Sequence, residues 1–439
     1  MNHRLVVDRQ QLLAHTFCDR PQARSGAAGQ DDALHGKNCI PDPRAYSVTE
    51  SRRWAPLTRF SFFSRRVEGV RVLEAWDKGV KALDYLGSWL LRLPLWLFIL
   101  VIGAIGVAKA TFIWKTPNVE GAALVFPQAT SSSDMLVGIG VVKLVQGSSW
   151  GYLIVTMVAL AAALVIVWRA GRTPETAVGT DRIRLILAVA WPFLMANLAW
   201  FGHGSEFLVL FIAMAVLLRS PWLWILGAAG ASLSHPTQAF ASFVGLLVLT
   251  WAPEFRQLRV RAVVGTVVGA ISTVSFSMWM AAAGVPSRID NALEVLFGSI
   301  LNALRHGILG LYSGWGVWWI VVLAAFVIVG RRGKMAIIVS GIVLPIIGTM
   351  VGWDGTRNFV AVAGATGLAL IWLLVRRDQE ASDTSKARSE TIRCRALGVV
   401  ALAFLVLPNV VILMVGDGVP RPGWMWVGLF ENFVLPRFG

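Results

Sequence analysis

Long apolar segments alternate with short polar stretches between residues 93 and 415, and this alternation constrains the fold more than any other feature. Only 15% of the residues are charged, whereas about a quarter are charged in typical soluble proteins. Mean hydropathy is correspondingly high, at +0.64. Backbone polar groups in hydrocarbon must be bonded within the chain, and a helix meets this requirement within one segment. The sequence therefore predicts an all-α, polytopic integral membrane bundle.

The apolar segments predict about eleven transmembrane helices, several of them short or broken. The predicted spans are 93–114, 150–168, 185–201, 206–218, 222–234, 238–251, 261–284, 313–330, 335–352, 358–376 and 396–415. Basic residues cluster at every second boundary, as the positive-inside rule expects of cytoplasmic loops. This pattern predicts a cytoplasmic N-terminus and a multi-pass plasma-membrane protein. It also accounts for the net charge of +15, so nucleic acid is not a predicted partner.

The same patterning divides the chain into four regions. Residues 1–66 are basic and lack apolar periodicity, which predicts a disordered cytoplasmic segment. Residues 67–92 carry apolar side chains at helical spacing, which predicts an amphipathic juxtamembrane helix on the membrane surface. Residues 93–415 form the predicted transmembrane domain, and residues 416–439 form a short extracytoplasmic tail.

The stretch from Trp200 to Phe240 is the best lead to function, because it contains two very short apolar segments, 206–218 and 222–234. Each has about 13 residues, whereas a helix needs about 20 to cross the hydrocarbon core. Polar groups lie at the same predicted end of these segments. They belong to His203, Glu206, His235 and Gln238. Ionisable groups are costly in a membrane unless they line a wet cavity or pair with one another, so this end is a candidate site.

The predicted topology places further polar side chains on the same outer face. They are Asp134, Asp354, Arg357 and Asn358. An arginine matches phosphate oxygens in a bidentate manner, and a carboxylate or imidazole can act as a general base. Together, these groups would suit a lipid phosphate or pyrophosphate whose tail enters the bilayer beside the short helices.

Each of these residues also has a simpler structural explanation. His235 precedes Pro236, and the residue before a proline favours an extended or turn conformation that breaks a helix. Glu206 would be favoured at a helix N-terminus by the helix dipole. Asp354 and Arg357 are three residues apart and could form a local ion pair. Both interpretations stay open at this point.

No cofactor is predicted from the sequence. A divalent cation is conceivable at Asp134, Glu206 and Asp354, but the chain has no DxD or HExxH pattern. It also lacks a Walker-type phosphate loop and a GxSxG motif. The three cysteines, Cys18, Cys39 and Cys394, show neither metal-ligand nor disulfide spacing.

The layout of residues 115–376 resembles that of polytopic glycosyltransferases of the GT-C superfamily. The matching features are the Ser205-Glu206 turn, the short helices, the ASLSHP sequence ending at Pro236, the SSSDMLVGIGVVKLVQG loop and the GWDGTRNF turn. The chain departs from the family in having His235 where Arg is frequent, in lacking the usual paired acids in the first outer loop, and in having no soluble C-terminal domain after the spans. The same features are similar to those of O-antigen and exopolysaccharide polymerases.

The resemblance implies transfer of a sugar from a polyprenyl-phosphate donor to a glycan acceptor on the outer face of the plasma membrane, in cell-envelope polysaccharide synthesis. It implies catalytic roles for Asp134 and Glu206, with Asp134 as the base that activates the acceptor hydroxyl. Arg357 and His235 would hold the donor phosphate, and Glu206 with His203 would shape the acceptor site. Gln238, Asp354 and Asn358 complete the predicted substrate-binding set.

Two other functions remain compatible with the sequence. A transporter or flippase for a lipid-linked or anionic solute would also use broken helices, although it predicts an inverted repeat and polar groups near the midplane. A membrane scaffold would use the basic N-terminal 90 or so residues as its interacting part. The lipid bilayer is a predicted partner in every case, and the oligomeric state is left open.

Overall fold

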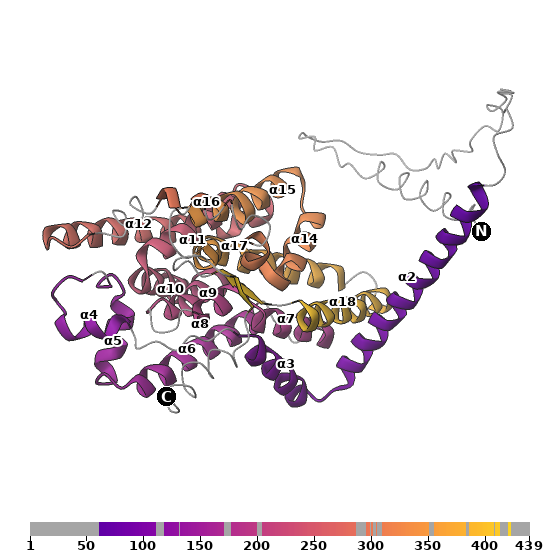
Figure 1. Cartoon of the computed structure of the whole chain (residues 1–439), viewed down its shortest axis with the longest axis horizontal. Coiled ribbons are helices and arrows are strands. Elements are labelled where there is room, and N and C mark those ends of the chain that lie inside the picture. Colours follow the sequence, from indigo (N-terminus) through magenta and orange to yellow (C-terminus); the bar gives the residue numbers. More distant parts are fainter. Residues whose placement is uncertain are drawn as a thin grey trace, which may run out of the picture. The chain divides into compact units, whose positions relative to one another are not determined.

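The structure, a computed structural model, describes the chain from residue 61 onward with gaps (Figure 1). The described ranges are 61–110, 118–130, 132–170, 177–199, 204–286, 296–298, 300–301, 304, 310–350, 355–382, 386–407, 409–412 and 420–422. Apart from residues 61–65, they belong to one compact unit, Arg66–Gly439. Most of the predicted N-terminal segment 1–66 and of the predicted tail 416–439 therefore lies outside the described residues.

The architecture is all-α, as predicted. The helices are α2 (Ser61–Arg92), α3 (Leu95–Lys109), α4 (Asn118–Val125), α5 (Leu136–Leu144), α6 (Ser149–Arg169), α7 (Val178–Val189), α8 (Pro192–Ala199), α9 (Glu206–Leu217), α10 (Pro221–Ser234), α11 (Pro236–Leu249), η1 (Pro253–Leu258), α12 (Arg259–Ala282), η2 (Gly316–Trp318), α14 (Trp319–Ile328), α15 (Arg331–Ile338), η3 (Val339–Val343), α16 (Leu344–Met350), α17 (Gly355–Ser382) and α18 (Lys386–Val406). The strands described are β1 (Val410–Ile412) and β2 (Pro420–Pro422), which pair antiparallel.

Five described helical stretches are long and apolar enough to cross a membrane. They are Ser149–Arg169, Pro253–Ala282, Gly310–Ile328, Arg331–Met350 and Thr356–Glu380. Residues Trp76–Arg92 of α2 and helix α3 would add a sixth span if counted together, but they meet at a bend of 119°. The length and apolar composition of these helices indicate a membrane protein. The count of about eleven spans, the cytoplasmic N-terminus and the plasma-membrane location stay predictions.

The short apolar helices α9, α10 and α11 lie side by side within the bundle (Figure 1). Pro221 and Pro236 begin α10 and α11, where a missing N–H costs no helical hydrogen bond. Gly227 on α10 lies against the backbone of Ala215 and Phe211, and Gly230, one turn later, lies against the Phe211 ring, so α10 runs back along α9. Most of α9 is buried on all sides, so protein rather than lipid covers its apolar surface. Burial inside the bundle explains how apolar helices of this length are accommodated.

Helix α17 is the central helix of the described bundle. Of its span window, 83% is buried, compared with 17% to 44% in the other four candidate spans. It packs against α8, α9, α11, α14 and α16. Ser242 on α11 accepts a hydrogen bond from the backbone N–H of Ala365, which fixes the crossing of these two helices. The polar residues at the start of α17 are therefore carried by the most enclosed element of the fold.

Interhelical contacts divide the described bundle into two ends. At one, here called the Arg261 end, Arg261 donates to the carbonyl of Val216, which joins the start of α12 to the last turn of α9. Glu254 accepts from the N–H of Gly330, which brings the junction of α14 and α15 to this end. The opposite end, called the Glu206 end, contains the start of α9 and the junction between α10 and α11.

Three predicted boundaries are corrected by the structure. The predicted span 185–201 is broken after Val189, because Pro192 cannot continue the helical hydrogen bonds of α7. The basic stretch between the predicted spans 358–376 and 396–415 is mostly helical rather than a loop, since α17 extends to Ser382 and α18 begins at Lys386. The predicted span 396–415 ends at Val406, and β1 follows it.

The predicted span 335–352 contains a stretch of π-helix, η3. Pro345 follows it in α16 and is buried. A proline ring clashes with the carbonyl four residues earlier, here Gly341, and a local π-helical turn relieves that clash. Trp315 uses the same carbonyl, since its indole N–H donates to Gly341 at 2.7 Å.

Candidate functional site

A buried carboxylate contacts a buried phenol at the Glu206 end. Glu206 is the first residue of α9 and is fully buried. The hydroxyl of Tyr152, on the first turn of α6, donates to Glu206 Oε2 at 3.2 Å. A buried carboxylate requires hydrogen-bond donors, and the N-terminus of a helix provides favourable dipoles as well. The position at a helix start predicted for Glu206 is confirmed, and the phenol is an addition that the sequence did not indicate.

Asp134 lies in a turn immediately before α5 and is 2% exposed. The neighbouring Ser133 ties this turn together, because its hydroxyl accepts from the N–H of Thr130 at 2.7 Å. Met135 then packs in a small apolar cluster at this end. The cluster comprises Ala122, Ala123, Met135, Ile139, Val142, Tyr152, Ala159 and Phe207. The same cluster therefore holds the residues that follow Asp134 and Glu206, and the structure brings the two predicted catalytic carboxylates to one region.

His235 and Gln238 lie where α10 gives way to α11. The backbone of His235 is extended, with φ −163° and ψ 91°, and its Nδ1 lies 3.2 Å from the hydroxyl of Thr237. His235 and Gln238 are both buried, at 3% and 5% exposure. No hydrogen bond to Gln238 Oε1 is found among the described residues. The helix break predicted from Pro236 is confirmed, and it places an imidazole and a carboxamide inside the protein.

Arg357 and Asn358 lie in the first turn of α17. Arg357 is 7% exposed, and Asn358 is partly buried. The neighbouring Thr356 shares a hydrogen bond of 2.9 Å with Ser313, and Phe359 packs edge-on against Trp315. These contacts fix the start of α17 beside the segment that precedes α14.

The described candidate residues thus all lie at the Glu206 end, in three places. Asp134 and Glu206 lie around the apolar cluster with Tyr152. His235 and Gln238 lie at the α10–α11 junction, and Arg357 and Asn358 lie in the first turn of α17, beside Ser313. Helices α9 and α17, which carry Glu206 and Arg357, pack against each other. His203 and Asp354 lie outside the described residues. Within the described part of the chain, no group of three His, Cys, Asp or Glu side chains could hold a metal ion.

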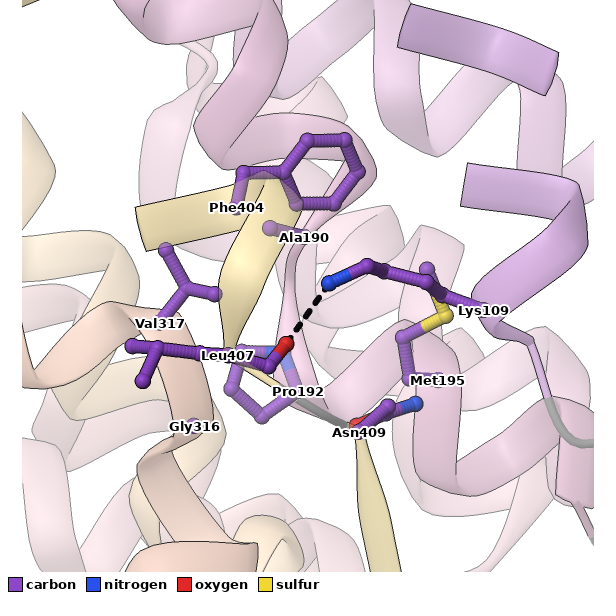
Figure 2. Close-up of a pocket in the computed structure, with 9 residues that line it drawn as sticks. All are labelled: Lys109, Ala190, Pro192, Met195, Gly316, Val317, Phe404, Leu407 and Asn409. Atoms are coloured by element: carbon purple, nitrogen blue, oxygen red, sulfur yellow. Dashed lines mark hydrogen bonds between the residues drawn. The ribbon is translucent and has the colours of Figure 1, made fainter. Parts of the chain in front are cut away.

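A pocket at the same end contains a lysine that sequence reasoning missed. Lys109, the last residue of α3, points toward the end of α18, and its Nζ donates to the carbonyl of Leu407 at 2.6 Å (Figure 2). The pocket is lined by Lys109, Ala190, Pro192, Met195, Gly316, Val317, Phe404, Leu407 and Asn409. The only sequence signal was one lysine inside the apolar segment 93–114. Its partners come from segments some 80 to 300 residues away, so no local pattern could reveal them.

Comparison with protein-family models, with curated proteins and with solved structures gave no match to this chain.

Proposed function

We propose that this protein is a membrane glycosyltransferase or polysaccharide polymerase that uses a polyprenyl-phosphate-linked sugar. The observation that carries the proposal is the buried Tyr152–Glu206 contact beside the Asp134 turn, inside a membrane bundle. Ionisable residues within a membrane bundle are rare and costly, and they generally mark functional sites. A lipid-linked donor also fits a protein whose polar groups lie at one end of apolar helices.

In the proposed reaction, Asp134 removes the proton from an acceptor hydroxyl, and the hydroxyl oxygen attacks the anomeric carbon of the donor sugar. The bond between that carbon and the phosphate oxygen breaks, and polyprenyl phosphate leaves with the electron pair. Arg357 and His235 stabilise the negative charge on the leaving phosphate. Glu206, held by Tyr152, accepts a hydrogen bond from the acceptor and orients it. Gln238 and Asn358 supply further polar contacts to the sugars.

The proposal is tested by sugar transfer in proteoliposomes. The purified chain is supplied with a panel of radiolabelled polyprenyl-phosphate hexoses and pentoses, and release of polyprenyl phosphate and transfer of label are both measured. Asp134→Asn should lower the transfer rate about 10² to 10⁴-fold, which is the usual contribution of a general base. Asp77→Asn, an exposed carboxylate on α2, is the matched control and should retain the wild-type rate.

Two results would count against the enzyme. One is transfer by Asp134→Asn and Glu206→Gln at the wild-type rate, and the other is no transfer from any donor by a folded wild-type protein.

A second function, transport of a lipid-linked or anionic solute, is supported by the broken helices. The α7–α8 and α10–α11 junctions and the π-helical turn η3 interrupt helices inside the bundle, as discontinuous helices do in many transporters. The same proteoliposomes distinguish the two functions. Movement of the labelled lipid between leaflets without any covalent product would favour transport, whereas release of polyprenyl phosphate would favour the transferase.

A further inference from the structure

Lys109 is a partly buried cation, and the contacts of its ammonium group include no carboxylate among the described residues. The ammonium meets one backbone carbonyl, that of Leu407, and lies 5.4 Å from the centre of the Phe404 ring. By contrast, Arg393 and Arg395 near the Arg261 end each form an ion pair with an aspartate. A desolvated charge is costly unless an opposite charge or several hydrogen bonds compensate it. Lys109 is therefore suited to receive an anion.

The other polar side chain of the pocket is also a donor. Asn409 Nδ2 is buried, and no hydrogen-bond acceptor for it is present among the described residues. Figure 2 shows the Lys109 ammonium directed at the Leu407 carbonyl, with the Asn409 side chain on the same side of the pocket as Lys109. The remaining lining side chains are apolar, apart from the glycine. An ammonium and an amide N–H₂ together favour an oxyanion, and charge-assisted hydrogen bonds to such oxygens are the stronger kind.

Exposed apolar side chains lie on α3 and α18, the two helices that carry Lys109 and Phe404. Lys109 at the end of α3 joins this helix to α18, because its ammonium contacts the Leu407 carbonyl and the Phe404 ring. Val107 on α3 is 50% exposed, and Leu405 and Val406 on α18 are 59% and 65% exposed. A free phosphate ion would make no use of these side chains, whereas a hydrocarbon tail would cover them. A lipid whose oxyanion reaches Lys109 would place its tail along these two helices.

We propose that the Lys109 pocket binds the phosphate group of an anionic lipid, whose tail lies along the exposed apolar faces of α3 and α18. The Lys109 ammonium donates hydrogen bonds to the phosphate oxygens, and its bond to the Leu407 carbonyl is either kept or replaced. The amide group of Asn409 supplies a second donor. This site is separate from the Asp134 and Arg357 groups and does not depend on the proposed transferase reaction.

The test measures lipid binding rather than activity. The purified chain in a neutral alkyl-maltoside detergent is titrated with phosphatidylglycerol, and bound lipid is counted by native mass spectrometry. Lys109→Gln should weaken binding about tenfold, as expected from loss of one charge-assisted hydrogen bond. Lys109→Arg should retain binding, because it keeps the charge.

The matched control is Lys143→Gln. Lys143, on α5 at the same end, is exposed and also lies over an aromatic ring, with its Nζ 4.9 Å from the centre of Phe126. Equal binding by Lys109→Gln and Lys143→Gln would overturn the proposal.

Inorganic phosphate distinguishes the two possible sources of the anion. At millimolar concentration it should neither displace phosphatidylglycerol nor raise the unfolding temperature of the wild-type protein. If it did either one as effectively as the lipid, the site would be a free-phosphate site and the lipid assignment would be wrong. The unfolding temperature of each variant, measured in the same detergent, shows that it is folded.

Discussion

At the residue scale, the polar side chains of the bundle fall into two kinds. Several hydroxyls bond back to their own helix: Ser232 to Ala228, Ser234 to Gly230 and Ser340 to Ala336. Such bonds satisfy the group locally and carry no information about other helices. Glu206 differs, because its partner Tyr152 comes from another helix, 54 residues earlier in the chain. This hydrogen bond forms only when α6 and α9 pack together, so it reports on the tertiary structure of the candidate site.

The first prediction concerns this pair. Tyr152→Phe keeps the ring that packs edge-on against Phe207 but removes the hydroxyl that donates to Glu206. Because the acceptor is a buried carboxylate, we expect the free energy of unfolding to fall by about 1 to 3 kcal/mol. Denaturant or thermal unfolding in detergent measures the change. The control is Tyr85→Phe, on α2, whose side chain is 75% exposed and which should be nearly neutral. Equal effects from the two substitutions would show that the hydrogen bond contributes no stability.

At the element scale, helix α2 is held to α18 by close backbone contact at two glycines. A Cβ on Gly87 would collide with the carbonyl of Cys394, and one on Gly398 would collide with the carbonyl of Leu83. Small residues let helices approach closely in this way. Arg395 adds a bidentate pair with Asp84, with hydrogen bonds of 2.9 and 2.8 Å. The helix predicted over residues 67–92 is confirmed as a helix, and specific contacts with α18 fix it to the described bundle.

A substitution in α2 tests this contact. Gly87→Val places a branched side chain against the Cys394 backbone, so α2 must move away from α18, at a cost of about 1 to 3 kcal/mol or more. Gly79→Val is the matched control, because no atom lies within 4 Å of a Cβ at that position. We expect a lowered unfolding temperature for Gly87→Val alone. A similar loss in both variants would mean that helix propensity, rather than packing against α18, determines the effect.

The elements that the sequence predicted well are those with a local cause. Pro221 and Pro236 mark the starts of α10 and α11, and the apolar runs between them set the lengths of the helices. The extension of α17 to Ser382 was missed, because the basic and acidic side chains there suggested a loop. In the structure, Arg376 and Arg377 pair with Glu380 along one face of the helix, and Asp378 bonds to Thr180 and Arg393. These contacts stabilise the helix, and the last two cannot be inferred from local sequence.

The candidate site likewise combines features that local sequence predicts with contacts between distant segments that it does not. The helix-start position of Glu206 and the break at His235 follow from neighbouring residues, and both are confirmed. The Tyr152 partner and the Lys109 pocket are formed by segments far apart in the sequence, so no spacing pattern could predict them. The predicted roles of these residues in catalysis and binding stay predictions.

At the scale of the whole molecule, the two ends of the described bundle differ in chemistry. The Arg261 end contains Arg261 and the basic residues Arg331, Arg332 and Lys334 in the first turn of α15. The Glu206 end contains the buried carboxylates and the Lys109 pocket. The positive-inside rule then predicts that the Arg261 end faces the cytoplasm. The proposed use of a lipid-linked sugar on the outer face requires this orientation, because the Glu206 end must meet the donor there.

Cysteine labelling in intact cells tests this orientation. In a variant with Cys18, Cys39 and Cys394 replaced by serine, Lys143→Cys introduces one exposed thiol at the Glu206 end, and Arg332→Cys introduces one at the Arg261 end. A membrane-impermeant maleimide should label Lys143→Cys in intact cells and Arg332→Cys only after the membrane is permeabilised. Labelling of both after permeabilisation is the control for thiol reactivity. The reverse pattern in intact cells would place the Glu206 end in the cytoplasm and exclude an outer-face reaction at this site.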